Sequence, residues 1–144
     1  MESPFNVINQ IGPCGITCGT CFLGNGSVAN SAKKTLNYIN VIGIKEWAPL
    51  VPEGSDLDWD DTEKTLNWMT KYAYCAGCEN GGGPPHCAIR ICAKEKAYDL
   101  CNACSELDDC TKFDWLGESA VALKQNLKEN SGKSRQDLVK QAQK

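Results

Sequence analysis

Ten cysteines lie between residues 14 and 110 of this 144-residue chain, and six of them form three C-x-x-C pairs. The pairs are Cys18/Cys21, Cys75/Cys78 and Cys101/Cys104. A C-x-x-C turn can direct two sulfurs at one point, and structural zinc sites take four such ligands in a tetrahedron. The alternative, five disulfides, needs an oxidising compartment, yet "MESPFNVINQIGP" lacks the basic residues and apolar core of a secretory signal. The spacing therefore favours metal ligation.

One complete ligand set stands out locally. Cys75, Cys78, Cys87 and Cys92 form C-x2-C-x8-C-x4-C, and the glycine-rich segment between the pairs can fold back over an ion. Cys87 lies just before an expected helix, where free N–H groups and the helix dipole favour a thiolate. We expect His86, the only histidine, to be a loop residue, and the alternative is that it replaces a cysteine as a ligand. We expect these four cysteines to form one metal centre.

The other six cysteines form two trios, neither of which closes a site alone. They are Cys14, Cys18 and Cys21 near the N-terminus, and Cys101, Cys104 and Cys110 further along. Together, the trios can hold a four-ligand site with two spare thiols or a binuclear cluster, and ligands can also be exchanged between segments. In each case the metal fastens distant parts of the chain together and couples folding to metal content.

All-thiolate sites bind zinc and also iron–sulfur clusters. The ferredoxin run C-x2-C-x2-C-x3-C-P is missing, so we expect zinc, two or more ions, with iron–sulfur clusters as the alternative. C-x3-C-x2-C also occurs in radical-SAM enzymes, but the chain has neither the length nor the alternating pattern of their βα barrel. We predict no catalytic residue. A weaker alternative is an enzyme or metal carrier with an open metal position on the N-terminal trio.

The hydrophobic spacing predicts a single, mainly α domain over residues 1–144, with little or no β structure. The metal-ligand region covers residues 14–110, and a polar helical tail follows from about residue 118 to 144. The tryptophans are expected in the core or over the metal sites, and Ile89 and Ile91 in packing between the centres. Helices are expected over 27–40, 60–74, 88–98 and 118–128, with a last one opened by a capping box at Ser134.

Charge and hydropathy limit the partners. The net charge of -3 and the pI near 5.2 do not favour nucleic acid. No apolar run approaches the roughly 20 residues of a membrane span. We therefore expect a cytoplasmic protein with a protein partner.

The motifs "PCGITCGTC", "CAGC" and "CAIRICAKEKAYDLCNACSELDDC" resemble a family of short cysteine-rich bacterial and archaeal proteins catalogued as a domain of unknown function. Two positions depart from its pattern. Ala97 stands where the family often has glycine, and Asp109 stands where proline commonly precedes the last cysteine. The resemblance implies metal binding and carries over no activity, substrate or catalytic residue. The resulting hypotheses are a metal-stabilised interaction or regulatory module and, as the alternative, a small iron–sulfur redox protein.

Overall fold

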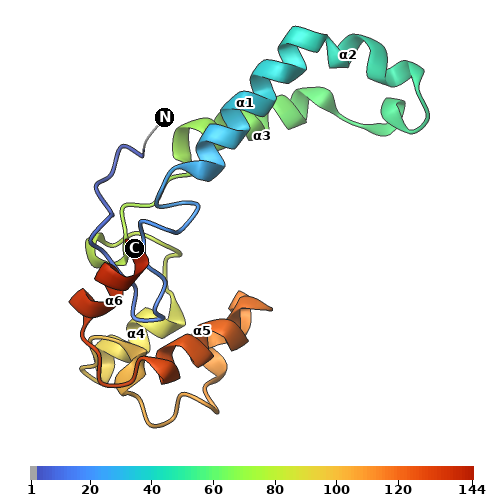
Figure 1. Cartoon of the computed structure of the whole chain (residues 1–144). Helices are drawn as coiled ribbons and strands as arrows, with labels where there is room; N and C mark the ends of the chain where they lie inside the picture. The colour runs from blue at the N-terminus through green and yellow to red at the C-terminus, as the bar shows by residue number, and fades with distance from the viewer. Residues whose placement is uncertain (1–2) are drawn as a thin grey trace.

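The computed structural model describes residues 3–144 and shows a cysteine-bearing body from which a long two-helix arm extends (Figure 1). Helices α1 and α3 form the arm, and α4, α5 and α6 belong to the body. Within residues 3–144 no strand forms, and the one β feature is an isolated antiparallel bridge between Ile11 and Thr17. The prediction of a mainly α fold is confirmed. The α-helices are α1 (Ser27–Ile42), α2 (Ile44–Trp47), α3 (Trp59–Tyr72), α4 (Ala88–Glu95), α5 (Ser119–Glu129) and α6 (Arg135–Ala142). Short 3-10 helices are η1 (Ala48–Leu50), η2 (Gly54–Asp56), η3 (Cys78–Asn80), η4 (Cys101–Ala103) and η5 (Thr111–Leu116).

Helix α4 ends at Glu95, three residues before the expected end at Tyr98. Ala97 adopts a left-handed φ of 57°, which carries the chain out of the helix. The N–H of Tyr98 donates to the carbonyl of Ala93 at 2.8 Å, and that of Ala97 donates to Lys94 at 3.2 Å. These two bonds form a Schellman motif, in which the left-handed residue is usually glycine.

The body core lies between α4, η5 and α5. Phe113 is 1% exposed, and Ile89 and Leu127 are buried beside it. Ile91, by contrast, is 43% exposed, so the expectation that it packs between the metal centres is wrong. It stands two residues from Ile89, and residues two apart do not share a helix face.

The C-terminal helix α6 begins with the predicted capping box. The Ser134 side chain accepts a hydrogen bond from the N–H of Asp137, whose carboxylate accepts one from the N–H of Ser134. The helix is polar on one side only, since Leu138 and Val139 are buried against Ile11. The C-terminal segment is thus packed onto the N-terminal one.

The arm consists of α1 and α3 packed against each other, with α2, η1 and η2 at its far end (Figure 1). Ala32 and Ile39 of α1 are buried between them, whereas α3 has no buried residue. Three of the four tryptophans, Trp47, Trp68 and Trp115, are exposed, so their expected place in the core or over a metal site is wrong. Within residues 3–144, no helix combines the length and the apolar character that crossing a membrane requires.

Candidate metal centre

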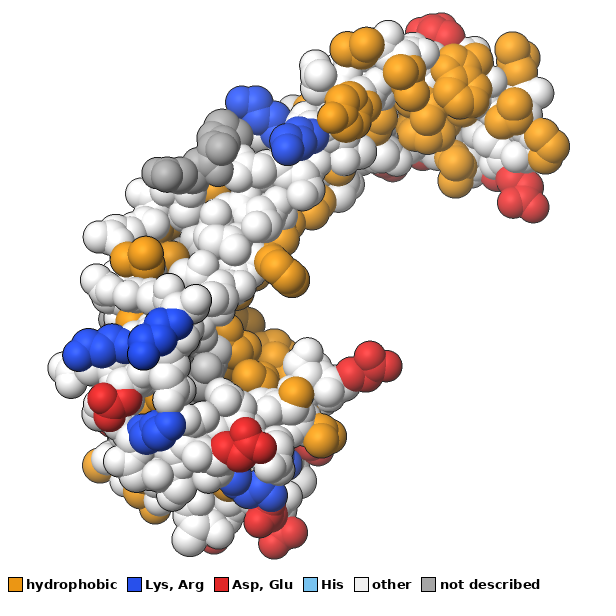
Figure 2. Space-filling view, in the orientation of Figure 1, with side chains coloured by type: hydrophobic (Ala, Val, Ile, Leu, Met, Phe, Trp, Pro, Cys, Tyr) orange, Lys and Arg blue, Asp and Glu red, His pale blue; other side chains and the backbone are white. Residues whose placement is uncertain are grey.

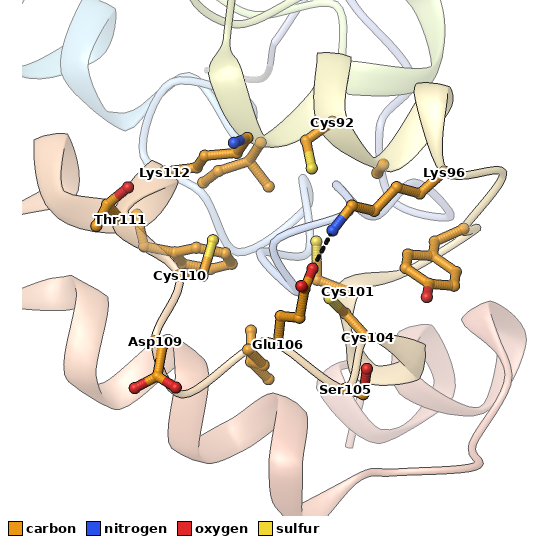
Figure 3. Close-up of a pocket in the computed structure, with 15 residues that line it drawn as sticks. Cys92, Lys96, Cys101, Cys104, Ser105, Glu106, Asp109, Cys110, Thr111 and Lys112 are labelled. Atoms are coloured by element: carbon orange, nitrogen blue, oxygen red, sulfur yellow. Dashed lines mark hydrogen bonds and ion pairs between the residues drawn. The ribbon is translucent and has the colours of Figure 1, made fainter.

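Four cysteines line one cavity of about 360 Å³ in the body (Figure 3). They come from three segments, namely α4, the C-x-x-C turn at η4 and the residue before η5, and their side chains lie around the same space in the close-up. Cavity-lining residues also include Phe113, Ile89 and Leu107 of the body core. We call this set the pocket thiols. They are Cys92, Cys101, Cys104 and Cys110.

Local backbone structure positions each pocket thiol. Cys92 stands on α4 between the buried residues Ile89 and Ala93. The N–H of Cys101 donates to the carbonyl of Pro13 at 2.9 Å, which holds η4 against the N-terminal loop. The N–H of Cys104 donates to the carbonyl of Cys101 at 3.0 Å and closes the C-x-x-C turn. Cys110 immediately precedes η5. The four sulfurs are therefore held by short hydrogen-bonded turns and one helix.

Burial and neighbouring thiols disfavour the ionised form of Cys101. Burial is the larger cause, and the charges of Cys14, Cys104, Cys110 and Cys92 add to it, raising the pKa of Cys101 to about 12. A buried thiol of this kind is protonated at neutral pH unless a cation lies beside it.

Cationic side chains surround the same cavity. Lys96 lines the cavity and forms an ion pair with Glu106 at its edge (Figure 3). The hydrogen bond that Lys96 donates to Glu106 is the main cause that raises the pKa of Lys96, and the nearby thiols Cys104 and Cys92 add to it. Lys124 reaches the same region and donates to the carbonyl of Cys110 at 2.7 Å. These ammonium groups can offset the negative charge of thiolates bound to a dication.

A second group of thiols gathers where the N-terminal loop meets the loop before α4. Cys18 and Cys78 are hydrogen-bonded through their side chains, an interaction that lowers the pKa of Cys18 and raises that of Cys78. The charges of Cys75 and Cys21 also act on Cys18. We call these four the loop thiols: Cys18, Cys21, Cys75 and Cys78.

Backbone contacts draw the two loops together. The sulfur of Cys75 accepts hydrogen bonds from the N–H groups of Gly83 at 3.0 Å and Gly77 at 3.4 Å. The N–H of Cys75 donates to the carbonyl of Leu23 at 3.2 Å. Arg90 of α4 lowers the pKa of Cys78 by its charge and hydrogen bond, against the larger opposing effects. These contacts hold the N-terminal loop and the loop before α4 together around the four sulfurs.

Cys14 and Cys87 lie between the two groups. Burial raises the pKa of Cys14 to about 11, with further contributions from Cys78 and Cys87. The charge of Cys14 in turn acts on Cys101. Cys87 is the residue that caps α4. His86 is exposed with a left-handed φ of 62° and does not line the cavity.

The structure groups the cysteines differently from their spacing along the chain. Cys92 lines the cavity with Cys101, Cys104 and Cys110, and Cys75 and Cys78 lie with Cys18 and Cys21. The N-terminal trio is thus divided, since only Cys14 interacts with Cys101. All ten cysteines are free thiols. In the part of the chain that the structure describes, no three Cys, His, Asp or Glu side chains converge closely enough to hold a metal ion as they stand.

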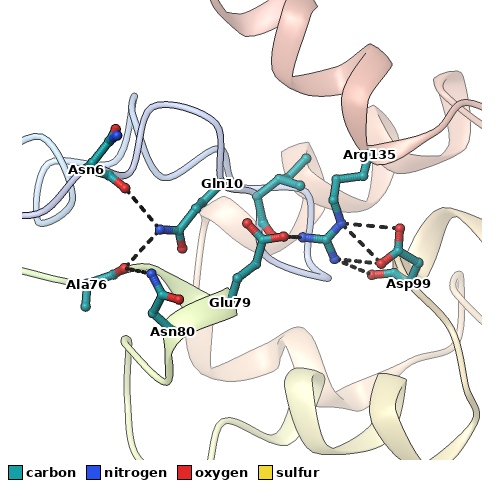
Figure 4. Close-up of polar contacts among 8 residues, drawn as sticks. Asn6, Gln10, Ala76, Glu79, Asn80, Asp99 and Arg135 are labelled. Atoms are coloured by element: carbon teal, nitrogen blue, oxygen red, sulfur yellow. Dashed lines mark hydrogen bonds and ion pairs between the residues drawn. The ribbon is translucent and has the colours of Figure 1, made fainter.

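Sequence reasoning missed the polar contacts that join the cysteine-bearing segments (Figure 4). Arg135, the first residue of α6, donates to the carboxylates of Asp99 and Glu79 and to the carbonyl of Ile11 at 3.2 Å. Gln10 donates to the carbonyls of Asn6 and Ala76, each at 3.2 Å. Each partner of Arg135 lies within three residues of a cysteine: Ile11 of Cys14, Glu79 of Cys78 and Asp99 of Cys101. No motif marks either side chain.

Comparison with protein families identifies a match over most of the chain. Residues 10–115 match a family described as "Protein of unknown function (DUF3795)". No curated protein and no solved structure matches the chain. The matched range includes all ten cysteines and stops before α5 and α6. Since it covers more than half of the chain, the protein belongs to the DUF3795 family.

Proposed function

We propose that this chain is a metal-binding protein whose thiolates hold two separate metal ions, zinc in preference, and thereby stabilise a protein-interaction or regulatory module. The observation that carries the proposal is the cavity lined by four cysteines. A set of four sulfurs matches the closed, four-ligand sites in which zinc has a structural role. Such a site supplies folding energy and has no open position for substrate.

Both the sulfur donors of the pocket thiols and the groups around them are suited to binding a dication. Cys101 is buried among apolar residues, where four uncompensated thiolates would be costly. A dication and the ammonium groups of Lys96 and Lys112, which also line the cavity, reduce that cost. The second ion belongs to the loop thiols, where the side chains of Cys18 and Cys78 are hydrogen-bonded to each other.

An iron–sulfur cluster is the second candidate, since it uses the same four thiolates. The volume of the cavity favours it, because about 360 Å³ is more than a single ion requires. The protein would then pass electrons instead of holding a module together.

Metal analysis and a visible spectrum of protein purified without oxygen distinguish the two. Colourless protein with two zinc ions per chain is the expected result. Brown protein with iron and acid-labile sulfide would support the redox function instead. Protein that binds neither zinc nor iron when both are supplied during folding would contradict the proposal as a whole.

A further inference from the structure

The far end of the arm exposes a group of large apolar side chains (Figure 2). We call residues 41–63 the arm tip. It includes α2, η1 and η2, with the adjoining ends of α1 and α3. Leu50 is 84% and Val41 74% exposed there. Monomeric proteins seldom expose apolar residues in such a group unless the surface binds something. The other large apolar residues of the patch are Ile42, Trp47, Val51 and Leu57.

The arm tip is held rigidly by its own backbone. The N–H of Val51 donates to the carbonyl of Ala48, and that of Gly54 donates to Val51, each at 3.1 Å. Gly54 packs so closely on the Ala48 carbonyl that a side chain has no room there. The Trp47 indole donates to the carbonyl of Ile42 at 3.0 Å. The apolar side chains are therefore presented on an ordered backbone, which reduces the entropy lost when a partner binds.

A strained residue lies within this turn. Glu53 has a left-handed φ of 67°, a conformation that is strained for a residue other than glycine. Backbone strain of this kind is found preferentially at binding and catalytic sites. Glu53 is exposed, and it lies in the sequence between the exposed apolar residues Val51 and Leu57.

Acidic residues surround the patch. The arm tip contains seven Asp and Glu residues and one lysine, so its net charge is -6, whereas the rest of the chain carries +3. The one lysine, Lys45, forms ion pairs with Asp60 and Glu63 inside the arm. Glu46 and Asp56 are exposed and form no ion pair with any residue from 3 to 144. The patch is therefore bordered by uncompensated negative charge.

The negative charge of the arm tip limits which partners can cover its apolar patch. A second copy joined tip to tip would oppose two surfaces of -6 each. The body of a second copy carries basic side chains, so a tip-to-body dimer is kept as one outcome of the test. Anionic lipid headgroups would repel the acidic border.

We infer that the arm tip docks a different protein, one with an apolar groove bordered by lysine and arginine side chains. Leu50 and Val41 enter the groove, and Glu46, Glu53 and Asp56 face its basic border. This rests on the proposed role of the body as a metal-stabilised module, and it assigns the binding surface of that module to the arm, away from both groups of thiols.

The test uses a synthetic amphipathic peptide of about 18 residues, leucine on one face and lysine on the other, as the probe. A fluorescent label on the peptide reports binding by anisotropy. The intact protein is expected to bind it, and to ignore the matched leucine/glutamate peptide. Replacing Leu50→Ser and Val41→Ser together should weaken binding about tenfold or more. Val121→Ser is the matched control, since Val121 is equally exposed, at 76%, but lies on α5.

The acidic border is tested in the same assay. Glu46→Gln with Asp56→Asn should weaken binding about threefold to tenfold and reduce its dependence on salt. Glu118→Gln, which removes an exposed carboxylate from the body, should leave binding unchanged.

Three results would overturn the inference. The first is failure of the leucine/lysine peptide to bind in preference to the leucine/glutamate peptide, or binding that survives Leu50→Ser with Val41→Ser. The second is a dimer in sedimentation that those substitutions abolish and Val121→Ser does not. The third is cosedimentation with phosphatidylserine/phosphatidylcholine vesicles that requires Leu50. Metal content is measured in each sample, so that metal-free protein contradicts the proposed function, and metal-loaded protein that ignores the peptide contradicts the docking inference alone.

Discussion

Arg135 and Asp99 are joined by a forked hydrogen bond. The Nη2 of Arg135 donates to Oδ1 of Asp99 at 2.7 Å, and its Nε lies 3.2 and 3.3 Å from the two carboxylate oxygens. The contact joins the first turn of α6 to the residue two positions before Cys101. With Glu79 and Ile11, it makes Arg135 the point at which the N-terminal loop, the loop thiols and the pocket thiols are tied together.

Replacing Arg135 with alanine should lower the free energy of unfolding by about 1–2 kcal/mol. Three hydrogen-bonded partners lose their donor, but the Asp99 and Glu79 carboxylates retain access to water, which limits the cost. Arg135→Lys should be intermediate, because an ammonium keeps the charge and loses the fork. Urea unfolding measures the difference. Lys133→Ala, at an exposed position, is the control, and equal effects of Arg135→Ala and Lys133→Ala would contradict the role assigned to Arg135.

The same contact should appear in the acid titration. The hydrogen bond from Arg135 holds the pKa of Asp99 below its usual 3.8. A carboxyl whose pKa is lower in the folded state stabilises the fold above the unfolded value, and that contribution is lost as the pH falls through the folded pKa. Asp99→Asn should therefore destabilise slightly near pH 6 and have less effect as the pH falls below 3.8.

An NMR titration of the Asp99 carboxyl tests the cause directly. In Arg135→Ala the pKa of Asp99 should return towards 3.8. An unchanged pKa would show that Arg135 is not responsible for the shift.

Ala97 is predicted to be a suboptimal residue at the end of α4. Its φ of 57° is the left-handed conformation in which glycine costs least, so Ala97→Gly should raise the free energy of unfolding by up to about 1 kcal/mol. The paired control is Ala122→Gly, at an exposed position inside α5. This substitution should lower the free energy of unfolding by about 1 kcal/mol. Chemical denaturation of both variants is sufficient. Destabilisation by both to the same extent would contradict the Schellman geometry.

The helices could be predicted from sequence because their signals are local. The apolar spacing in α1 and the reciprocal cap at Ser134 and Asp137 each lie within a few turns of the chain. The grouping of the cysteines could not be predicted, because it depends on contacts between distant residues. Arg135 meets a residue 36 positions away at Asp99 and one 124 positions away at Ile11. No periodicity encodes such a contact.

The course of the backbone explains the remaining differences between the predicted and the observed positions of residues. The spacing C-x2-C-x8-C-x4-C predicts that Cys87 and Cys92 share a site, and the structure places Cys87 at the cap of α4 and Cys92 on the helix, lining the cavity. The exposed tip of the arm was missed for a related reason. Trp47 and Leu50 are large apolar residues of the kind that a core usually contains. They are exposed because α1 and α3 extend away from the body.

The central claim is that the pocket thiols and the loop thiols are two separate centres. Cys104→Ser and Cys18→Ser test it, with Ser105→Ala and Thr20→Ala as controls at neighbouring positions that lack a thiol. Circular dichroism of each variant checks that the helices persist.

The decisive measurement is the zinc content per chain of these four variants, and of the double variant Cys104→Ser with Cys18→Ser, after folding with excess zinc and removal of unbound metal. Each serine variant should lose one ion, the double variant should lose both, and the controls should lose none. If either single serine variant keeps its helices but loses all of its metal, the thiols form one shared site. If both single serine variants keep their full metal content, these thiols are not ligands. Either result would contradict the two-centre account.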